Sequence, residues 1–370
     1  MKKIRVITIV GTRPEIIKLS QVIKKCDSFF EHKIIHTGQN YDYELNQIFF
    51  EDLDIRKPDF FLEVSGKNLG ESIGNVISKT YDLLDNIKPD CILILGDTNS
   101  CLSAISAKRL KIPIFHLEAG NRCFDQNVPE EINRKIVDHV SDVNLTYTEN
   151  ARKYLLMEGI RKDFIFNVGS PMKEILLSYQ NKIDSSNILN ILKLRKKEYI
   201  VVSVHREENL DIADNFTNIL NALDEVSSKK DMQIIFSTHP RTRKKLEKMN
   251  RENNPKISFI KPLGFFDYIS LQLDAYVTLS DSGTLAEEAS LLKFPSVSLR
   301  NSTERPEAID SGSLILGSVN KTNIINSIDI AINLKDIKEP LDYDSPNCSD
   351  KVIKIIQGYT SIINSEVWKK

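Results

Sequence analysis

The sequence predicts an α/β protein with two doubly wound domains, and three observations support this. Short apolar runs rich in Ile and Val alternate with longer amphipathic stretches, as in parallel strands buried on both faces and joined by crossover helices. The length of 370 residues corresponds to about two domains of roughly 150 residues each. A strongly charged stretch, Asn181 to Glu198, separates two series of apolar runs. We therefore expect two Rossmann-like domains with a cleft between them.

Each apolar run is expected to form one strand. In the first half the runs are Ile4 to Val10, Lys33 to His36, Cys91 to Leu95, Ile114 to His116, Val143 to Tyr147 and Phe164 to Val168. In the second half they are Tyr199 to Val204, Gln233 to Ser237, Ile257 to Ile260, Ala275 to Leu279, Ser296 to Leu299 and Ser313 to Leu316. The tail has apolar residues at helical spacing, which predicts a terminal helix at about 352–370. We place the first domain at 1–170, joined by this helix, and the second at 171–351.

Composition and charge exclude several classes of protein. Hydrophobic residues make up 41% and charged residues 27%, so collagenous, low-complexity and disordered chains fit poorly. The net charge of -1 gives no overall attraction to nucleic acid or to an anionic membrane. Five cysteines without a CxxC pair disfavour a metal site and a disulfide framework, and fit a cytoplasmic protein. The apolar stretch before Gly11 is too short for a signal peptide.

The first polar segment that can carry chemistry is Gly11-Thr12-Arg13-Pro14-Glu15, directly after the first strand. Ligands of open parallel sheets bind beyond the carboxyl ends of the strands, and Pro14 suits the first position of a helix. Arg13 would then stand beside a helix N-terminus, a good seat for a phosphate. The alternative is an ordinary turn with a surface Arg13. The segment lacks the GxGxxG fingerprint, which disfavours a dinucleotide-dependent dehydrogenase.

Three carboxylates are expected at one rim of the first sheet. Asp97 and Glu118 follow consecutive strands, and Glu130 follows shortly after in Pro129-Glu130-Glu131. A doubly wound sheet brings such strand ends together, where carboxylates can act as acids, bases or charge stabilisers. Asp97 is equally well placed to cap a helix.

The second half opens in a similar way. Its first strand ends at His205 and Arg206, and the neighbouring strand ends at His239. A histidine at a strand end can bind a phosphate or transfer a proton. The alternative, a structural role, is about as well supported for His205 as a role at a site.

A second anion site is expected at Ser282-Gly283-Thr284, after the strand that ends at Leu279. Small residues let backbone N–H groups approach a diphosphate at the helix N-terminus, and Glu288, one turn in, can accept both hydroxyls of a ribose. Thr284 and Glu287 also fit a capping box. Arg305 offers a further guanidinium to the same phosphates. Anion-binding elements in one half and carboxylates in the other suit a nucleoside diphosphate sugar.

These segments together resemble the non-hydrolysing UDP-N-acetylglucosamine 2-epimerases, whose pattern is GTRPE, GDT, HxEAG, PEExNR, HRxEN, DSGxxEE and TERPE. The chain has GTRPE, GDTNS, HLEAG, PEEINR, HREEN, DSGTLAEE and TERPE in the same order. The resemblance covers about residues 4–317. It implies a GT-B type fold, no cofactor or metal, and a homodimer.

The resemblance also implies roles for residues at the matching positions. The UDP part would be bound by Arg13, Lys18, His205, Ser282, Gly283, Thr284, Glu288 and Arg305, with the uracil flanked by Pro262 to Tyr268. The catalytic group would comprise Asp97, Glu118, Glu130 and His205, and no metal ligand is implied. His239 and Arg206 are further candidates for the site.

The chain departs from better-known members of the family in three places. It has GDTNS where they tend to have GDTTT, residues 121–127 replace the LRT that follows EAG, and Gln39-Asn40-Tyr41-Asp42 replaces a Gln-His-Arg segment associated with allosteric binding of UDP-N-acetylglucosamine. With these departures the sequence resembles the capsule and O-antigen subgroup of the family. That subgroup makes UDP-N-acetyl-L-fucosamine from UDP-2-acetamido-2,6-dideoxy-L-talose. The alternatives are the parent UDP-N-acetylglucosamine 2-epimerase and a glycosyltransferase of the same fold.

Overall fold

The computed structural model describes residues 3–38, 49–212, 214–249, 254–334 and 336–370. The chain forms two compact units. Unit 1 comprises Met1–Arg122, Pro129–Leu177 and Asp342–Lys370, and unit 2 comprises Cys123–Val128 and Ser178–Leu341. The segment Gln39-Asn40-Tyr41-Asp42 lies outside the described residues.

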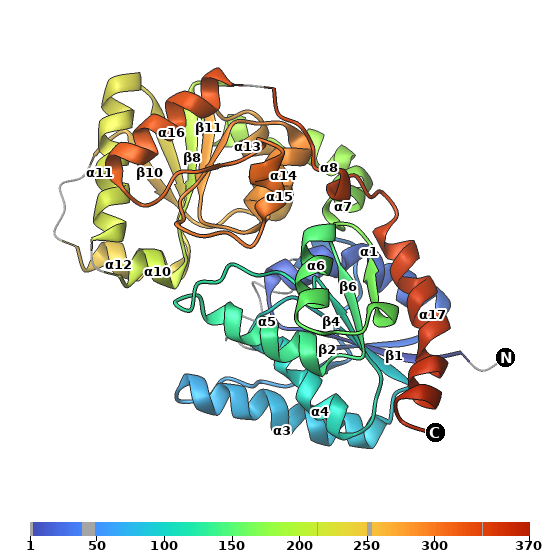
Figure 1. Ribbon diagram of the computed structural model, residues 1–370. Helices are drawn as coiled ribbons and strands as arrows, with labels where there is room; N and C mark the ends of the chain where they lie inside the picture. The colour runs from blue at the N-terminus through green and yellow to red at the C-terminus, as the bar shows by residue number, and fades with distance from the viewer. Residues whose placement is uncertain (1–2, 39–48, 213, 250–253, 335) are drawn as a thin grey trace. The chain divides into compact units, whose positions relative to one another are not determined.

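Unit 1 is built on a parallel sheet with helices on both of its faces (Figure 1). In spatial order its strands among the described residues are β3 (Phe60–Phe61), β2 (Glu31–His36), β1 (Arg5–Val10), β4 (Cys91–Leu95), β5 (Ile114–Leu117), β6 (Val143–Thr146) and β7 (Ile165–Asn167). The order reverses between β1 and β4, where Thr8 lies opposite Leu93. This is the switch point at which open α/β sheets bind ligands.

Amphipathic helices cover the sheet of unit 1. They are α1 (Arg13–Phe29), α3 (Leu69–Ile87), α4 (Ser103–Arg109), α5 (Pro129–Val140), α6 (Glu149–Met157), α7 (Met172–Ser178) and α17 (Cys348–Glu366), with 3-10 turns η1 (Asn99–Leu102), η2 (Lys162–Phe164) and η3 (Leu341–Tyr343). Ile7, Ile92 and Ile114 of the central strands lie in a buried core cluster. Because these strands are covered on both faces, their sequences read as continuous apolar runs.

The sheet of unit 2 has the same pattern of strand order. Its strands among the described residues are β10 (Ile257–Ile260), β9 (Gln233–Ser237), β8 (Tyr199–Ser203), β11 (Val277–Ser280), β12 (Ser296–Ser298) and β13 (Ile315–Leu316), all parallel. Its helices are α8 (Gln180–Asp184), α9 (Ile188–Ile191), α10 (Glu207–Leu210), α11 (Asn215–Lys230), α12 (Pro240–Glu247), α13 (Phe265–Leu273), α14 (Thr284–Leu292), α15 (Pro306–Asp310) and α16 (Lys321–Asn333). The switch point lies between β8 and β11.

The end of the first unit lies later than residue 170, where the sequence analysis placed it. The reason is that α7 is tied to the C-terminal helix, because Glu174 accepts hydrogen bonds from the backbone N and the hydroxyl of Ser349. The expected terminal helix is present as α17, beginning at Cys348, and it packs against α1 (Figure 1).

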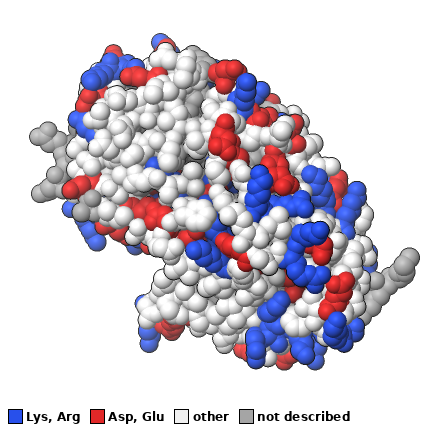
Figure 2. Space-filling view, viewed as in Figure 1, with Lys and Arg blue, Asp and Glu red and all other residues white. Residues whose placement is uncertain are grey.

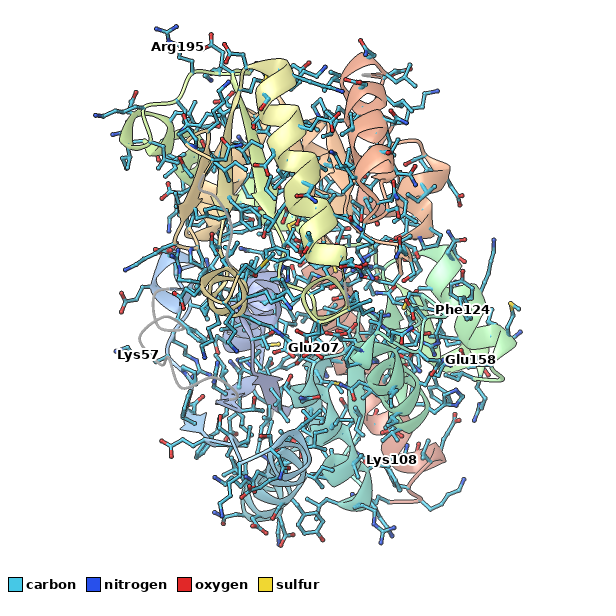
Figure 3. The ribbon with its side chains drawn as sticks, turned by 90° about the vertical axis from the view of Figure 1, so that its left-hand side faces the viewer. Lys57, Lys108, Phe124, Glu158, Arg195 and Glu207 are labelled. Atoms are coloured by element: carbon cyan, nitrogen blue, oxygen red, sulfur yellow. The ribbon has the colours of Figure 1, made fainter. Side chains whose placement is uncertain are left out.

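In the charged segment Asn181 to Glu198, Arg195 projects away from the ribbon (Figure 3).

Every run that the sequence analysis expected to be a strand forms one, with ends within two residues of the expected positions. Strand β3 was not predicted, because two residues shortly after a proline are too few to give a periodic signal. Acidic and basic side chains intermingle on the face shown in Figure 2, which agrees with the net charge of -1. Among the described residues, no helix combines the length and apolarity that a membrane span needs.

Candidate active site

The turn after β1 is organised by a buried carboxylate, Glu15. Helix α1 begins at Arg13, with Pro14 in its first turn as expected. Oε2 of Glu15 accepts from the backbone N of Gly11 at 2.6 Å and of Thr12 at 2.7 Å. Glu15 thereby satisfies N–H groups that a helix start leaves without partners in the helix.

The same carboxylate joins this turn to the loop after β4. Oε1 of Glu15 accepts from the hydroxyl of Thr98 at 2.8 Å and from the hydroxyl of Ser100. Burial raises the pKa of Glu15, and the hydrogen bonds from Ser100, Thr98 and the backbone oppose that rise. Glu15 therefore fixes the two loops of the switch point against each other. This role was not predicted from the sequence, although a Glu three residues after Thr12 is its signal.

Arg13 stands at the start of α1, where the sequence predicted a guanidinium. Its Cζ lies 4.4 Å from the centroid of the Phe49 ring, which is a cation–π contact. Arg13 is partly buried and lies beside a helix N-terminus, where an anion was expected.

Glu118 is paired with Lys18. Nζ of Lys18 donates to both Oε1 and Oε2 of Glu118 at 2.8 Å, and the two side chains are 6% and 11% exposed. The backbone φ of Glu118 is 70°, a value that residues other than glycine rarely adopt. Such backbone conformations cluster at functional sites. Oε2 of Glu118 lies beside Gly96, the residue before Asp97, at 3.6 Å from where a Cβ of Gly96 would stand.

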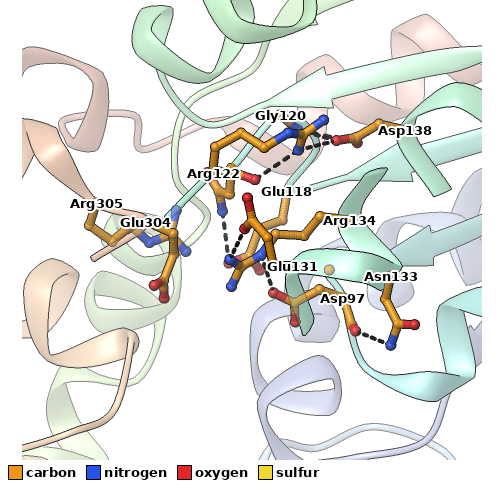
Figure 4. Close-up of polar contacts among 12 residues, drawn as sticks. Asp97, Glu118, Gly120, Arg122, Glu131, Asn133, Arg134, Asp138, Glu304 and Arg305 are labelled. Carbon is orange, nitrogen blue, oxygen red and sulfur yellow. Dashed lines mark hydrogen bonds and ion pairs between the residues drawn. The ribbon is translucent and has the colours of Figure 1, made fainter. Parts of the chain in front are cut away.

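Asp97 is paired with Arg134 and does not cap a helix. Its Oδ2 accepts from Nε of Arg134 at 2.7 Å, and the cap of η1 is Thr98. Asn133 donates to the backbone O of Asp97 at 2.8 Å, so the Asn-Arg pair of the PEEINR segment holds this residue at both its backbone and its side chain. Figure 4 shows Asp97, Glu131 and Arg134 together with Glu118. Arg134 and Asn133 are functional candidates that the sequence analysis did not name.

Glu130 occupies the first turn of α5 and is partly buried. Its neighbour Glu131 is fully buried and accepts from Nη1 of Arg134 at 2.9 Å. The structure therefore brings the predicted carboxylates Asp97 and Glu118 to the ends of adjacent strands. It places Glu130 on the helix that supplies the partner of Asp97.

A buried network fixes the loop that carries Glu118. Asp138 accepts from the backbone N of Gly120 and from Nη1 of Arg122 at 2.7 Å, and it lies 3.0 Å from Nδ1 of His116. Although burial raises it, the pKa of Asp138 is held below its ordinary value by His116 and Arg122. Arg122 also forms a bidentate pair with Glu158. The two hydrogen bonds from the Arg122 guanidinium to Glu158 limit the movement of the loop.

Residues at which the chain departs from the family pattern have protein partners. The hydroxyl of Ser100 donates to Glu15, and Oδ1 of Asn99 accepts from Asn133 at 3.2 Å. Nδ2 of Asn121 lies 3.5 Å from Oε1 of Glu118. In unit 2, Oδ2 of Asp125 accepts from the hydroxyl of Ser302 at 3.3 Å. Three of these contacts join the loop to another segment of the chain, and that of Asn121 lies within its own loop.

In unit 2, Asp281 organises the switch point. It is fully buried and accepts from the backbone N of His205 at 2.9 Å and of Arg206 at 2.9 Å. Its Oδ1 lies 2.9 Å from Nδ1 of His205. Burial raises the pKa of Asp281, but the charge and hydrogen bonds of His205 and the backbone hydrogen bond from Arg206 outweigh it and lower the pKa to about 2. The aspartate fixes the histidine ring through Nδ1, so Nε2 is the ring nitrogen left for a ligand.

The neighbouring candidates extend this cluster. His239 follows the end of β9, and the centroid of its ring lies 5.9 Å from the centroid of the His205 ring. His239 caps α12, because its Nδ1 accepts from the backbone N of Arg241. Nη2 of Arg206 lies 3.6 Å from Oε1 of Glu304. That oxygen would be only 2.6 Å from a Cβ on Gly283, so no larger residue fits there without displacing Glu304.

The start of α14 differs from the expected capping box. The cap is Gly283 and Thr284 is the first helical residue. Glu287 does not reach back to the cap, because its Oε2 lies 3.3 Å from Nη2 of Arg305. Instead, the hydroxyl of Ser282 lies 3.0 Å from that of Thr284 and accepts weakly from the Thr284 backbone N. The small residues Ser282 to Thr284 thus form the helix N-terminus at which an anion was expected.

Glu288 lies in the second turn of α14 and is buried. Its Oε2 accepts from Nε2 of Gln272 at 3.0 Å. Tyr268 lies on the same helix as Gln272, and burial and the charge of Glu288 raise the pKa of its hydroxyl. Gln272 was not among the residues predicted from the sequence. Among the described residues, no group of three or more His, Cys, Asp or Glu side chains is arranged to hold a metal ion.

Each unit therefore contributes chemistry at its own switch point. Unit 1 presents two carboxylates, each on a buried cation, together with Arg13. Unit 2 presents a helix N-terminus, a histidine fixed by an aspartate, and a carboxylate held by an amide. These groups are suited to binding an anion and to transferring protons.

Comparison with known proteins assigns the chain to a family. Residues 24–357 match the model of the UDP-N-acetylglucosamine 2-epimerase family. The chain is 34% identical to a Pseudomonas aeruginosa protein described as UDP-2,3-diacetamido-2,3-dideoxy-D-glucuronate 2-epimerase, over 87% of this chain and 91% of that protein. The chain belongs to the non-hydrolysing UDP-N-acetylglucosamine 2-epimerase family and is an isomerase.

Two solved structures show the same fold. That of UDP-N-acetylglucosamine 2-epimerase from Rickettsia bellii has a TM-score of 0.93 at 47% identity, covering 100% of both chains. That of the Methanocaldococcus jannaschii enzyme, in complex with UDP-GlcNAc and UDP, has a TM-score of 0.90 at 36% identity and covers 96% of this chain and 99% of the other. The prediction of an α/β protein with two parallel sheets is confirmed.

Proposed function

We propose that the chain inverts the configuration at C2 of a UDP-2-acetamido sugar by eliminating UDP and adding it back. The observation that carries the proposal is the pair of carboxylates at the switch point of unit 1. Each is held on its own buried cation, Glu118 on Lys18 and Asp97 on Arg134. The reaction requires both half-sites to act on one substrate molecule.

The first step is departure of UDP from C1. The C2 hydrogen is not next to a carbonyl, so direct removal would be very slow. Breaking the C1–O bond gives C1 oxocarbenium character and acidifies the C2 hydrogen. The leaving diphosphate is stabilised by the N-terminus of α14 at Ser282 to Thr284, by Nε2 of His205, and by the guanidinium groups of Arg13 and Arg305.

The second step is loss of the C2 proton to a carboxylate, which leaves a glycal with a C1–C2 double bond. Protonation of C2 on the opposite face and return of UDP to C1 give the epimer, and atoms and charge balance over the cycle. Asp97, Glu118 and Glu130 supply the acid and base groups, because the reaction needs proton transfer on two faces. Lys18 pairs with Glu118 at 2.8 Å and Arg134 pairs with Asp97 at 2.7 Å, so each of these two carboxylates is held by a cation.

The first candidate substrate is UDP-N-acetylglucosamine, because the family and both solved relatives carry that name. The second is UDP-2-acetamido-2,6-dideoxy-L-talose, with a role in surface polysaccharide synthesis, which the sequence departures favour. Departing residues Asn99 and Ser100 have protein partners, so they do not by themselves separate the two. A homodimer in the cytoplasm is part of the proposal, and sedimentation tests the oligomeric state.

The test is NMR of the protein in deuterated water with each UDP-sugar in turn and no acceptor. The proposal predicts deuterium at C2 and appearance of the C2 epimer for one of the two sugars. A glycosyltransferase needs an acceptor and gives neither signal. A hydrolysing relative releases UDP and free sugar irreversibly, and a sugar-nucleotide sensor binds without exchange. Absence of C2 exchange with both sugars contradicts the proposed function.

A further inference from the structure

One buried side chain beside Glu288 has no part in the mechanism above. Gln272 lies on α13 and is 0% exposed, and its Nε2 donates to Oε2 of Glu288 at 3.0 Å. Burying an amide costs free energy unless its polar atoms are hydrogen-bonded, whereas Met of similar volume carries no such cost. The contribution of Gln272 is therefore its bond to Glu288 rather than packing.

The other end of the amide supports this reading. Oε1 of Gln272 is buried and has no hydrogen-bond partner among the described residues. Leaving a buried acceptor unsatisfied costs free energy. Turning the amide over would place its oxygen against the carboxylate of Glu288, where two acceptors repel. The amide is held in one orientation for the sake of the carboxylate.

Tyr268 lies one turn before Gln272 on α13, so both side chains lie on the same face of this helix. Together with burial, the charge of Glu288 contributes to raising the pKa of the Tyr268 hydroxyl. The hydrogen bond from Gln272 limits rotation of the Glu288 carboxylate, whose terminal torsion is otherwise broad.

We propose that Gln272 is a positioning residue that makes the site selective for a ribonucleotide over a 2′-deoxyribonucleotide. The inference rests on the proposed function and on the expectation from the sequence that Glu288 accepts from both hydroxyls of the UDP ribose. A carboxylate accepts from two vicinal hydroxyls only in one orientation. The hydrogen bond from Gln272 to Oε2 fixes that orientation, and without it the carboxylate rotates and the contact with the 2′-hydroxyl weakens.

The experiment is titration calorimetry of UDP and 2′-deoxy-UDP with the wild type, Gln272→Met and Gln272→Glu. The wild type is expected to prefer UDP. Gln272→Met should lower the ratio of the two affinities about tenfold, the scale of one hydrogen bond to a charged group, by weakening UDP alone. Gln272→Glu, which places two carboxylates together, should lower the ratio at neutral pH and restore part of it on acidification. Gln233→Met, at an exposed glutamine of β9, is the matched control and should change nothing.

Two results would overturn the inference. If Gln272→Met leaves the ratio of the two affinities unchanged, whether both affinities fall equally or neither falls, Gln272 has only a structural role. The variant Glu288→Gln separates this failure from that of the proposed function. A lowered ratio in Glu288→Gln with an unchanged ratio in Gln272→Met overturns the role of Gln272 alone. An unchanged ratio in Glu288→Gln overturns the ribose assignment as well.

Discussion

Nζ of Lys18 lies 2.8 Å from both carboxylate oxygens of Glu118, and neither side chain is more than 11% exposed. Lys18 comes from α1 and Glu118 from the end of β5, so the pair links two elements at the carboxyl edge of the sheet of unit 1. Removing one partner of a buried pair leaves the other charge uncompensated, which costs several kcal/mol. The pair therefore fixes the position of a proposed catalytic group.

The variant Lys18→Met is predicted to lower turnover by at least about 100-fold, because Glu118 loses the buried cation that holds its carboxylate in place. Steady-state kinetics with the UDP-sugar measures this. Lys25→Met is the matched control on the same helix, since Lys25 pairs with Glu174 and Asp350 far from the switch point. Equal losses in both variants would show that the effect is structural.

Replacing the proposed acid and base groups should separate chemistry from binding. Asp97→Asn and Glu118→Gln are each expected to lower turnover by at least about 100-fold, the usual scale for a lost acid–base group, while UDP binding changes little. Turnover assays and calorimetry with UDP test both parts. Asp142→Asn, at a buried aspartate paired with Lys108, is the control. Near-normal turnover in both site variants would refute the assignment of the carboxylates.

Glu15 should matter for turnover although it touches no substrate in the proposed mechanism. Glu15→Gln cannot accept at both oxygens, so the loops carrying Arg13 and Asp97 shift, and a misplacement of about 1 Å costs about 100-fold. The control is Glu174→Gln, at another buried glutamate that accepts from a backbone N and a serine hydroxyl. We expect both variants to lose stability and only Glu15→Gln to lose turnover per folded molecule. Full turnover in Glu15→Gln would contradict the positioning role.

The aspartate beneath His205 predicts a pH dependence of stability. The pKa of Asp281 is about 2 in the fold, whereas an unfolded Asp titrates at about 3.9. A lowered pKa stabilises the fold above the unfolded value, and the contribution, about 2 to 3 kcal/mol, is lost as the pH falls through the folded value. The difference in free energy of unfolding between wild type and Asp281→Asn should therefore shrink between about pH 4 and pH 2. Urea unfolding measures it, and a constant difference would contradict the account.

Much of the fold was predictable because parallel strands buried on both faces leave continuous apolar runs in the sequence. The carboxylates Asp97 and Glu118 were predictable from their positions at strand ends. Their partners were not, because Lys18 and Arg134 lie on helices, and sequence periodicity does not say which helical cation reaches which strand end. The capping box at Thr284 was wrong, since Arg305 competes for Glu287 through a contact distant in sequence. Gln272 left no signal at all, because a single amide in a helix is unremarkable until its neighbours are known.

The central claim is that the C1–O bond breaks before C2 loses its proton. Positional isotope exchange tests it most directly, using UDP-sugar with oxygen-18 in the bridge between C1 and the β-phosphate. The account predicts that the label moves into non-bridging positions of the β-phosphate while the sugar epimerises, because the freed diphosphate rotates before it returns. Epimerisation at C2 with the label still wholly in the bridge would contradict it.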